Sequence, residues 1–126
     1  MTDMASIDLF ATDAEATAAF YRAIGLDLMD EAHDDGPVHF AVELGDLHFA
    51  IHSAQTPAGP AERRAGGSSF PGFYASSLDL VSDVLASTGA RVLTGHEEMP
   101  WGCRIVVEDP DGRPVEVTQR SHCRPD

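Results

Sequence analysis

The stretch Gly102–Gln119, GCRIVVEDPDGRPVEVTQ, decides the fold. Its first part, Gly102–Val107, is an almost continuous apolar run, and Pro114–Gln119 alternates apolar with polar residues; both patterns are typical of strands. Between them, Asp109-Pro110-Asp111-Gly112 has proline and glycine at the positions that a tight turn favours. The stretch therefore predicts two strands joined by a turn, each strand with one apolar face.

The residues before this stretch predict a helix and two further strands. Phe70–Leu78 has the composition of a strand, and Asp79 is a suitable N-cap for a helix through Leu80, Val84 and Leu85 that ends at Gly89. Arg91–His96 is expected to be extended. We interpret His96-Glu97-Glu98 as a solvated turn, and the second half of the chain as strand, helix and three strands.

The first half of the chain repeats this order of elements. Met4–Phe10 predicts a strand, and Thr12-Asp13-Ala14-Glu15 matches a capping box in which Thr12 caps the helix. The helix has apolar residues at helical spacing and ends at Gly25, 64 residues before Gly89. Three extended segments follow: Leu26–Ala32, Pro37–Leu44 and Leu47–Ser53. Such an internal repeat predicts two copies of one structural unit.

We therefore predict an α+β fold made of two units, residues 1–54 and 70–120. Residues 55–69 are rich in Ala, Gly, Pro and Arg and show no periodicity, so they are expected to form a linker loop. Residues 121–126 are expected to be a frayed tail.

The charge balance limits the partners of the chain. Its 126 residues include 8 basic and 21 acidic side chains, a net charge of −13, which disfavours nucleic acids and anionic membranes and suits a neutral or cationic ligand. All the basic residues are arginine, so Schiff-base chemistry and a phosphate-binding P-loop lysine are excluded. The N-terminus lacks the apolar core of a signal peptide, and no segment has 18 consecutive apolar residues. We expect a cytoplasmic protein.

The two cysteines, Cys103 and Cys123, show no pattern. They predict neither a disulfide framework nor a CxxC metal site. Strand alternation places Cys103 on the apolar face, where its thiol is expected to be buried and inert.

Strand alternation also gathers polar side chains on the opposite faces of the sheets. The residues in question are His39, His48, His52, Arg104 and Glu116. A polar sheet face is often simply exposed to water. The alternative is that the two repeats curl these faces into a trough that holds a ligand.

Three phrases of the sequence are similar to those of a known superfamily. They are Phe20-Tyr21-Arg22-Ala23-Ile24-Gly25-Leu26, Pro100-Trp101-Gly102, and Glu108-Asp109-Pro110-Asp111-Gly112 followed by Val115-Glu116-Val117. In this order they resemble the glyoxalase / bleomycin-resistance / extradiol-dioxygenase (vicinal oxygen chelate) superfamily. The resemblance implies two βαβββ modules that form curved mixed sheets around a ligand trough, with the helices on the outer face, and a homodimer.

The resemblance also allows the metal site of glyoxalase-like members to be compared with this chain. The four ligand positions would fall at Ser6, at Ala50 or His52, at Phe73 and at Glu116. A divalent metal needs three or four nitrogen or oxygen ligands, and Phe73 cannot supply one. We therefore expect no cofactor; if a divalent metal ion binds, His52 and Glu116 are the expected ligands. The simpler alternative for Glu116 is that it forms an ion pair with Arg104.

The resulting hypothesis is a metal-free protein that binds a small molecule, as bleomycin-resistance proteins sequester a drug, and so contributes to antibiotic resistance or metabolite binding. The expected ligand-binding residues are His39, His48, His52, Phe73, Trp101, Arg104 and Glu116. Trp101 and Phe73 would offer flat stacking surfaces, although core or dimer packing explains Trp101 equally well. The alternative is an enzyme: a metal-dependent lyase, isomerase or dioxygenase with an atypical ligand set, or a metal-free epimerase that uses Glu116 and a histidine as acid and base. No catalytic residue is assigned.

Overall fold

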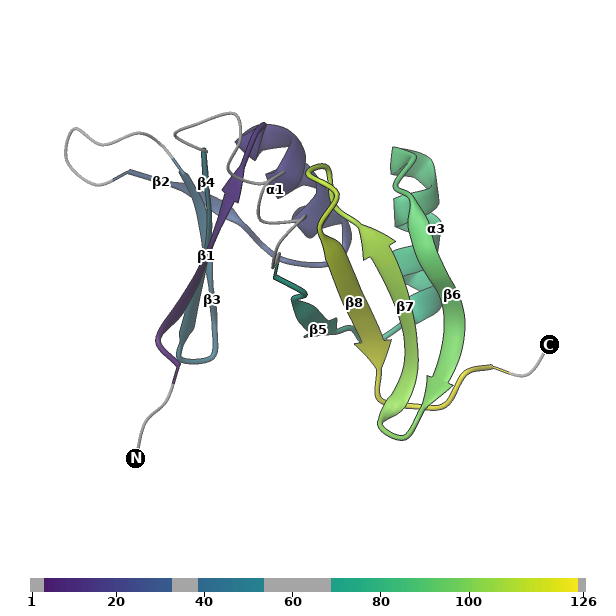
Figure 1. Ribbon diagram of the computed structural model, residues 1–126. Helices are drawn as coiled ribbons and strands as arrows, with labels where there is room; N and C mark the ends of the chain where they lie inside the picture. The colour runs from purple at the N-terminus through teal and green to yellow at the C-terminus, as the bar shows by residue number, and fades with distance from the viewer. Residues whose placement is uncertain (1–3, 33–38, 54–68, 125–126) are drawn as a thin grey trace.

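Two four-stranded sheets, each with one helix against it, form the structure (Figure 1). The computed structural model describes residues 4–32, 39–53 and 69–124. The first module contains β1 (Ser6–Ala11), α1 (Ala14–Ala23), β2 (Met29–Glu31), β3 (His39–Leu44) and β4 (Leu47–Ser53). The second contains β5 (Gly72–Tyr74), α3 (Leu78–Thr88), β6 (Val92–Met99), β7 (Gly102–Glu108) and β8 (Pro114–Gln119).

The two sheets have the same topology. Their strand orders are β1-β4-β3-β2 and β5-β8-β7-β6. In each sheet the strand before the helix pairs parallel with the last strand, and the other pairings are antiparallel. The repeated βαβββ unit and the α+β class are confirmed. The linker predicted at 55–69 falls outside the described residues except for Ser69.

Each helix covers the apolar face of its own sheet, and the two helices also contact each other. The buried side chains form one cluster that includes Leu9, Phe49 and Ile51 of the first sheet and Val107 and Val117 of the second. Alternation along the strands therefore predicts the buried faces correctly. No helix in the described part of the chain is both long enough and apolar enough to cross a membrane.

A buried polar network joins the modules. The Tyr21 hydroxyl on α1 donates to Oδ2 of Asp109 in the β7–β8 turn at 3.0 Å. Arg113 donates to the same oxygen at 2.6 Å and to the backbone oxygen of Phe10 at 2.7 Å. Tyr21, Asp109 and Arg113 are all buried. Since Tyr21 and Phe10 belong to the first module, the turn predicted from its proline and glycine also forms a contact between the modules.

The N-cap residue of each helix differs from the one that the sequence predicts. Asp13, not Thr12, caps α1 through a hydrogen bond from the Ala16 amide, and the Thr12 amide donates to the Asp111 carboxylate of the second module. Ser77, not Asp79, caps α3.

The prediction of a turn at His96-Glu97-Glu98 is wrong. These residues lie in β6, which extends to Met99 and pairs with β7, with register shifts between Val92 and Glu97. Polar side chains on an edge strand resemble a turn in sequence because only one side of the strand is paired.

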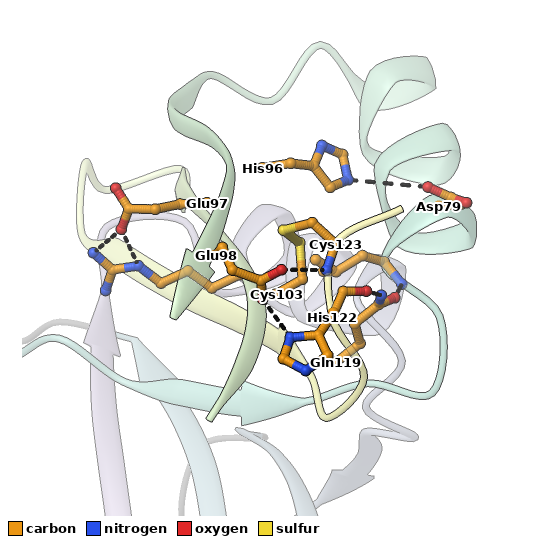
Figure 2. The surroundings of a disulfide bond; sticks show 10 residues. Asp79, His96, Glu97, Glu98, Cys103, Gln119, His122 and Cys123 are labelled. Atoms are coloured by element: carbon orange, nitrogen blue, oxygen red, sulfur yellow. Dashed lines mark hydrogen bonds and ion pairs between the residues drawn. A yellow bond between two sulfur atoms is a disulfide. The ribbon is translucent and has the colours of Figure 1, made fainter. Parts of the chain in front are cut away.

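The predictions for the cysteines and the tail are also wrong. Cys103 and Cys123 form a disulfide. The sequence does not predict this bond, because the two cysteines lie 20 residues apart and match no motif. Cys103 is fully buried as expected. The bond holds residues 120–124 against the second module, so the described part of the tail is anchored rather than frayed (Figure 2).

Candidate functional site

The polar faces of the two sheets do not meet within the described part of one chain. Phe73 of β5 contacts Phe49 on the apolar face of the first sheet, with 5.5 Å between ring centroids. The second module and α1 therefore lie on the apolar side of the first sheet (Figure 1). The strand register puts the histidines on the opposite face of this sheet. The sheets are not closed into a common trough. Within one chain, the predicted site residues of the first sheet therefore lie apart from those of the second.

On the first sheet, histidines and carboxylates form a chain of contacts across three strands. His39 Nε2 lies 3.2 Å from Glu31 Oε1, and His48 Nε2 lies 3.7 Å from the same oxygen. His48 Nδ1 is also hydrogen-bonded to Glu43. The hydrogen bond to Glu43, with further contributions from nearby carboxylates, raises the pKa of His48 above its usual 6.5.

The remaining histidine of this face, His52, pairs with the adjacent strand β1. Its Nε2 lies 2.8 Å from Asp8 Oδ1, and its ring stacks on that of His39 at 4.6 Å. The three predicted histidines thus share one face, with each imidazole beside a carboxylate.

On the second sheet, a small cavity of about 130 Å³ lies on the polar face. Its lining residues are Gly72, Phe73, Tyr74, Trp101, Glu116 and Thr118. Tyr74 and Trp101 are 59% and 48% exposed, so both aromatic rings offer free surface. We call this cavity the Trp101 pocket.

An ion pair fixes the carboxylate of the Trp101 pocket. Arg104 Nη1 donates to Glu116 Oε1 at 3.0 Å, and Nη2 lies 2.8 Å from Glu97 Oε1. Hydrogen bonds to Glu116 and Glu97 raise the pKa of Arg104, so the guanidinium stays charged. The pairing of Glu116 with Arg104 suggested by the sequence is confirmed.

Two further features equip the Trp101 pocket for a ligand. Gly72 leaves room for the carboxylate, because a Cβ there would lie 3.0 Å from Glu116 Oε2. Thr118 is only 3% exposed, and its Oγ1 has no hydrogen-bond partner among the described residues. A buried hydroxyl without a partner is costly and indicates a missing one, such as water or a ligand. The site prediction omitted Thr118 and Tyr74, although the alternation of β8 puts Thr118 on the Glu116 face.

Phe73 does not present its ring as a stacking surface. Its register beside Val117 puts the side chain on the apolar face, where the ring contacts Tyr21 at 5.8 Å as well as Phe49. The ring of Trp101, in contrast, is exposed.

The positions that match metal ligands in glyoxalase-like proteins do not form a metal site within this chain. Ser6 and His52 belong to the first sheet, Phe73 to the core, and Glu116 to the second sheet, where Arg104 binds it. Within residues 4–32, 39–53 and 69–124, no three histidine, cysteine, aspartate or glutamate side chains are arranged to hold a metal ion.

Comparison with solved structures supports the fold. The chain is 20% identical to TioX from Micromonospora sp. ML1, with a TM-score of 0.66 over 94% of this chain and 99% of that one. A glyoxylase/bleomycin resistance protein/dioxygenase domain from Frankia sp. EAN1pec is also 20% identical, with a TM-score of 0.72 over 95% and 98%. TnmS3, described as an antibiotic binding protein from Streptomyces sp. CB03234, is 20% identical, with a TM-score of 0.67 over 96% and 98%.

The sequence itself identifies the family. No curated protein matches the chain. The family model for the Glyoxalase/Bleomycin resistance protein/Dioxygenase superfamily, however, matches residues 3–117. Together with the two βαβββ modules, this match shows that the chain belongs to the glyoxalase/bleomycin resistance protein/dioxygenase superfamily.

Proposed function

We propose that the protein binds a small organic molecule at the Trp101 pocket without a metal ion. The observation that carries the proposal is the buried hydroxyl of Thr118, which belongs to the lining of the pocket and has no hydrogen-bond partner in the part of the chain that the structure describes. A ligand that hydrogen-bonds this hydroxyl would remove the cost of leaving it unpaired.

The chemistry of the lining favours a flat ligand that is neutral or cationic. Trp101 offers an exposed ring for stacking, and Tyr74 adds a largely exposed ring over which the Arg120 guanidinium lies. Glu116 uses Oε1 to bind Arg104, so Oε2 beside Gly72 is the atom that would accept a hydrogen bond from a ligand amine or hydroxyl. The net charge of −13 adds a long-range attraction for cations.

We further propose that the protein acts as a homodimer. A cavity of about 130 Å³ is small beside the roughly 300–1,000 Å³ of drug-sized pockets, so the ligand needs a second wall. The histidine face of the first sheet cannot supply that wall within its own chain, but the same face of a second copy can. His39, His48 and His52 would then contribute to the site from the partner, and the protein would act in the cytoplasm.

Sequestration of a drug or metabolite is the role that fits best. Sequestration requires only a pocket that is complementary to the ligand, and it does not require a metal ion. The description of TnmS3 as an antibiotic binding protein supports this role for the present fold.

Catalysis is the alternative, and one observation favours it. His48 is held by Glu43, and the hydrogen bond to Glu43 raises the pKa of His48, which favours the protonated form that a general acid requires. A metal-free epimerase would use this histidine with Glu116 of another copy. A metal-dependent lyase, isomerase or dioxygenase would need a ligand set that is completed outside the described part of one chain.

Binding can be tested with the single tryptophan of the chain. Trp101 fluorescence should be quenched saturably by 9-aminoacridine, a flat cation, and much less by anthracene-9-carboxylate, an anion of the same shape. Glu116→Gln and Thr118→Val should each weaken binding of the cation about fivefold or more. Asp83→Asn, which removes one charge from the exposed side of α3, is the matched control and should bind normally.

The same experiment can refute the proposal. Absence of saturable quenching by either probe would contradict it, as would equal affinities of the Glu116→Gln and Asp83→Asn variants. Metal analysis of protein purified without a His-tag separates the alternatives, because stoichiometric zinc, nickel, manganese or iron would favour the metal-dependent enzyme.

A further inference from the structure

We propose that the Cys103–Cys123 disulfide is a redox modification site that controls the Trp101 pocket. Reduction by a dithiol would release the C-terminal tail and weaken ligand binding, and oxidation would restore it. The effect on binding rests on the function proposed above, whereas the effect of reduction on the conformation of the pocket does not.

The disulfide is the main anchor of the tail. The other contacts of residues 121–124 include a backbone hydrogen bond between the Cys103 amide and Ser121, and hydrogen bonds and ion pairs at the surface. Figure 2 shows the contacts of His122 and Cys123 with Glu98. Glu98 binds the Cys123 amide at 3.2 Å and His122 Nδ1 at 3.0 Å, and Arg124 lies 2.7 Å from Asp79. Exposed ion pairs contribute little stability, so the tail is expected to detach when the covalent bond opens.

The anchored segment is in direct contact with the pocket. Ser121 accepts a hydrogen bond from the Cys103 amide at 3.1 Å. One residue earlier, the Arg120 guanidinium lies over the Tyr74 ring, 4.0 Å from its centroid. Tyr74 lines the Trp101 pocket, so movement of the tail would change one wall of the binding site.

The other aromatic residue of the pocket is coupled to the same segment through the backbone. Trp101 is followed by Gly102, where a Cβ would lie only 2.1 Å from the backbone oxygen of Gln119 and 3.1 Å from the Cα of Arg120. Cys103, the buried half of the disulfide, comes next in the chain. The turn that carries Trp101 therefore packs directly against Gln119 and Arg120, the two residues that precede the tail.

The accessible sulfur determines how reduction would proceed. Cys103 is fully buried, whereas Cys123 is only partly buried, so the thiolate of an external dithiol would attack Cys123. The S–S bond breaks, Cys103 leaves and takes up a proton, and Cys123 is joined to the reductant in a mixed disulfide. The second thiol of the reductant then displaces Cys123, giving two protein thiols and an oxidised reductant. Disulfides in a reducing compartment are usually transient or redox-sensing, which suits such a role in the cytoplasm.

The test compares the full chain in its two oxidation states. Thiol alkylation of denatured protein should label no cysteine after oxidation and two after reduction. We expect reduction to weaken 9-aminoacridine binding about twofold or more, because the Tyr74 wall of the pocket loses the cation–π contact with Arg120 that fixes it. Reduction should also shift the emission maximum of Trp101 in the absence of any probe.

Two variants separate the disulfide from the rest of the tail. Cys123→Ser keeps the buried Cys103 in place; it should match the reduced protein and give the same result with and without reductant. His122→Gln removes a tail contact but keeps both cysteines, and it should retain the full response to reductant.

The proposal is overturned if oxidised and reduced protein bind the probe equally, if the oxidised protein still contains two free thiols, or if Cys123→Ser responds to reductant. If oxidised protein binds neither probe, the function proposed above fails; the emission of Trp101 then decides the redox coupling, and an unchanged emission maximum overturns it.

Discussion

Replacement of Tyr21 by phenylalanine tests the junction between the modules. The Tyr21 side chain is fully buried, and its hydroxyl donates to a carboxylate of the other module at 3.0 Å. Burial, reinforced by the charge of Asp109, raises the pKa of Tyr21 above its usual 10.0, so the hydroxyl is a donor at any pH at which the protein is studied.

The expected loss of stability follows from the contacts of Asp109. A hydrogen bond to a charged group contributes about 1.5–3 kcal/mol. After the substitution Asp109 still accepts hydrogen bonds from the Arg113 side chain at 2.6 Å and from the amides of Asp111 and Arg113 at 2.9 Å. The carboxylate is therefore not left unpaired, and a loss of about 2 kcal/mol is expected for Tyr21→Phe.

Urea unfolding followed by circular dichroism measures this change. Tyr74→Phe is the matched control, because Tyr74 is largely exposed and should lose less than about 0.5 kcal/mol. A Tyr21→Phe protein within about 0.5 kcal/mol of the wild type would refute the reasoning, because the buried hydrogen bond between the modules would then contribute nothing.

Three further predictions follow from single residues. Cys123→Ser should lower the free energy of unfolding by about 3 kcal/mol, the chain-entropy effect of a closed loop of this length, measured in urea without reductant. Gly102→Ala should destabilise strongly, because its φ is +143° and its Cβ would collide with the backbone of β8; Gly95→Ala, with open space around it, should not. NMR titration should give His48 a pKa above 6.5 that Glu43→Gln lowers. Because the pKa is raised on folding, the stabilisation is complete below pH 6.5 and is lost as pH rises through the folded pKa.

The sequence predicts the fold well because the repeating pattern is local. Alternation within Leu47–Ser53 and Pro114–Gln119 predicts those strands to the residue, and Gly25 and Gly89 follow the two helices with positive φ. These signals depend only on neighbours along the chain, so no tertiary contact is needed to interpret them.

The errors occur where a distant residue decides the outcome. Thr12 and Asp13 are both capable N-caps, and the Thr12 amide is bound by Asp111, 99 residues away, which no local pattern shows. Cys103 forms a disulfide with Cys123 only because the tail folds back against β7. Tertiary contacts of this kind leave no periodic signal in the sequence.

Strand alternation predicts which sheet faces carry the candidate site residues, but not how the two faces are arranged in space. The histidines, Arg104 and Glu116 all lie on polar sheet faces, as strand alternation requires. The pattern of a single strand cannot show how two sheets are oriented, and the packing of Phe49 against Phe73 directs the first face away from the second module.

The central claim is that the Trp101 pocket binds organic molecules without a metal. Its most direct test is the dissociation constant of 9-aminoacridine, measured by Trp101 quenching on protein dialysed against EDTA and on the same protein given zinc, nickel or manganese. The account predicts saturable binding to the EDTA-treated protein, with an affinity that added metal does not change. Binding that appears only after a metal is added would contradict it.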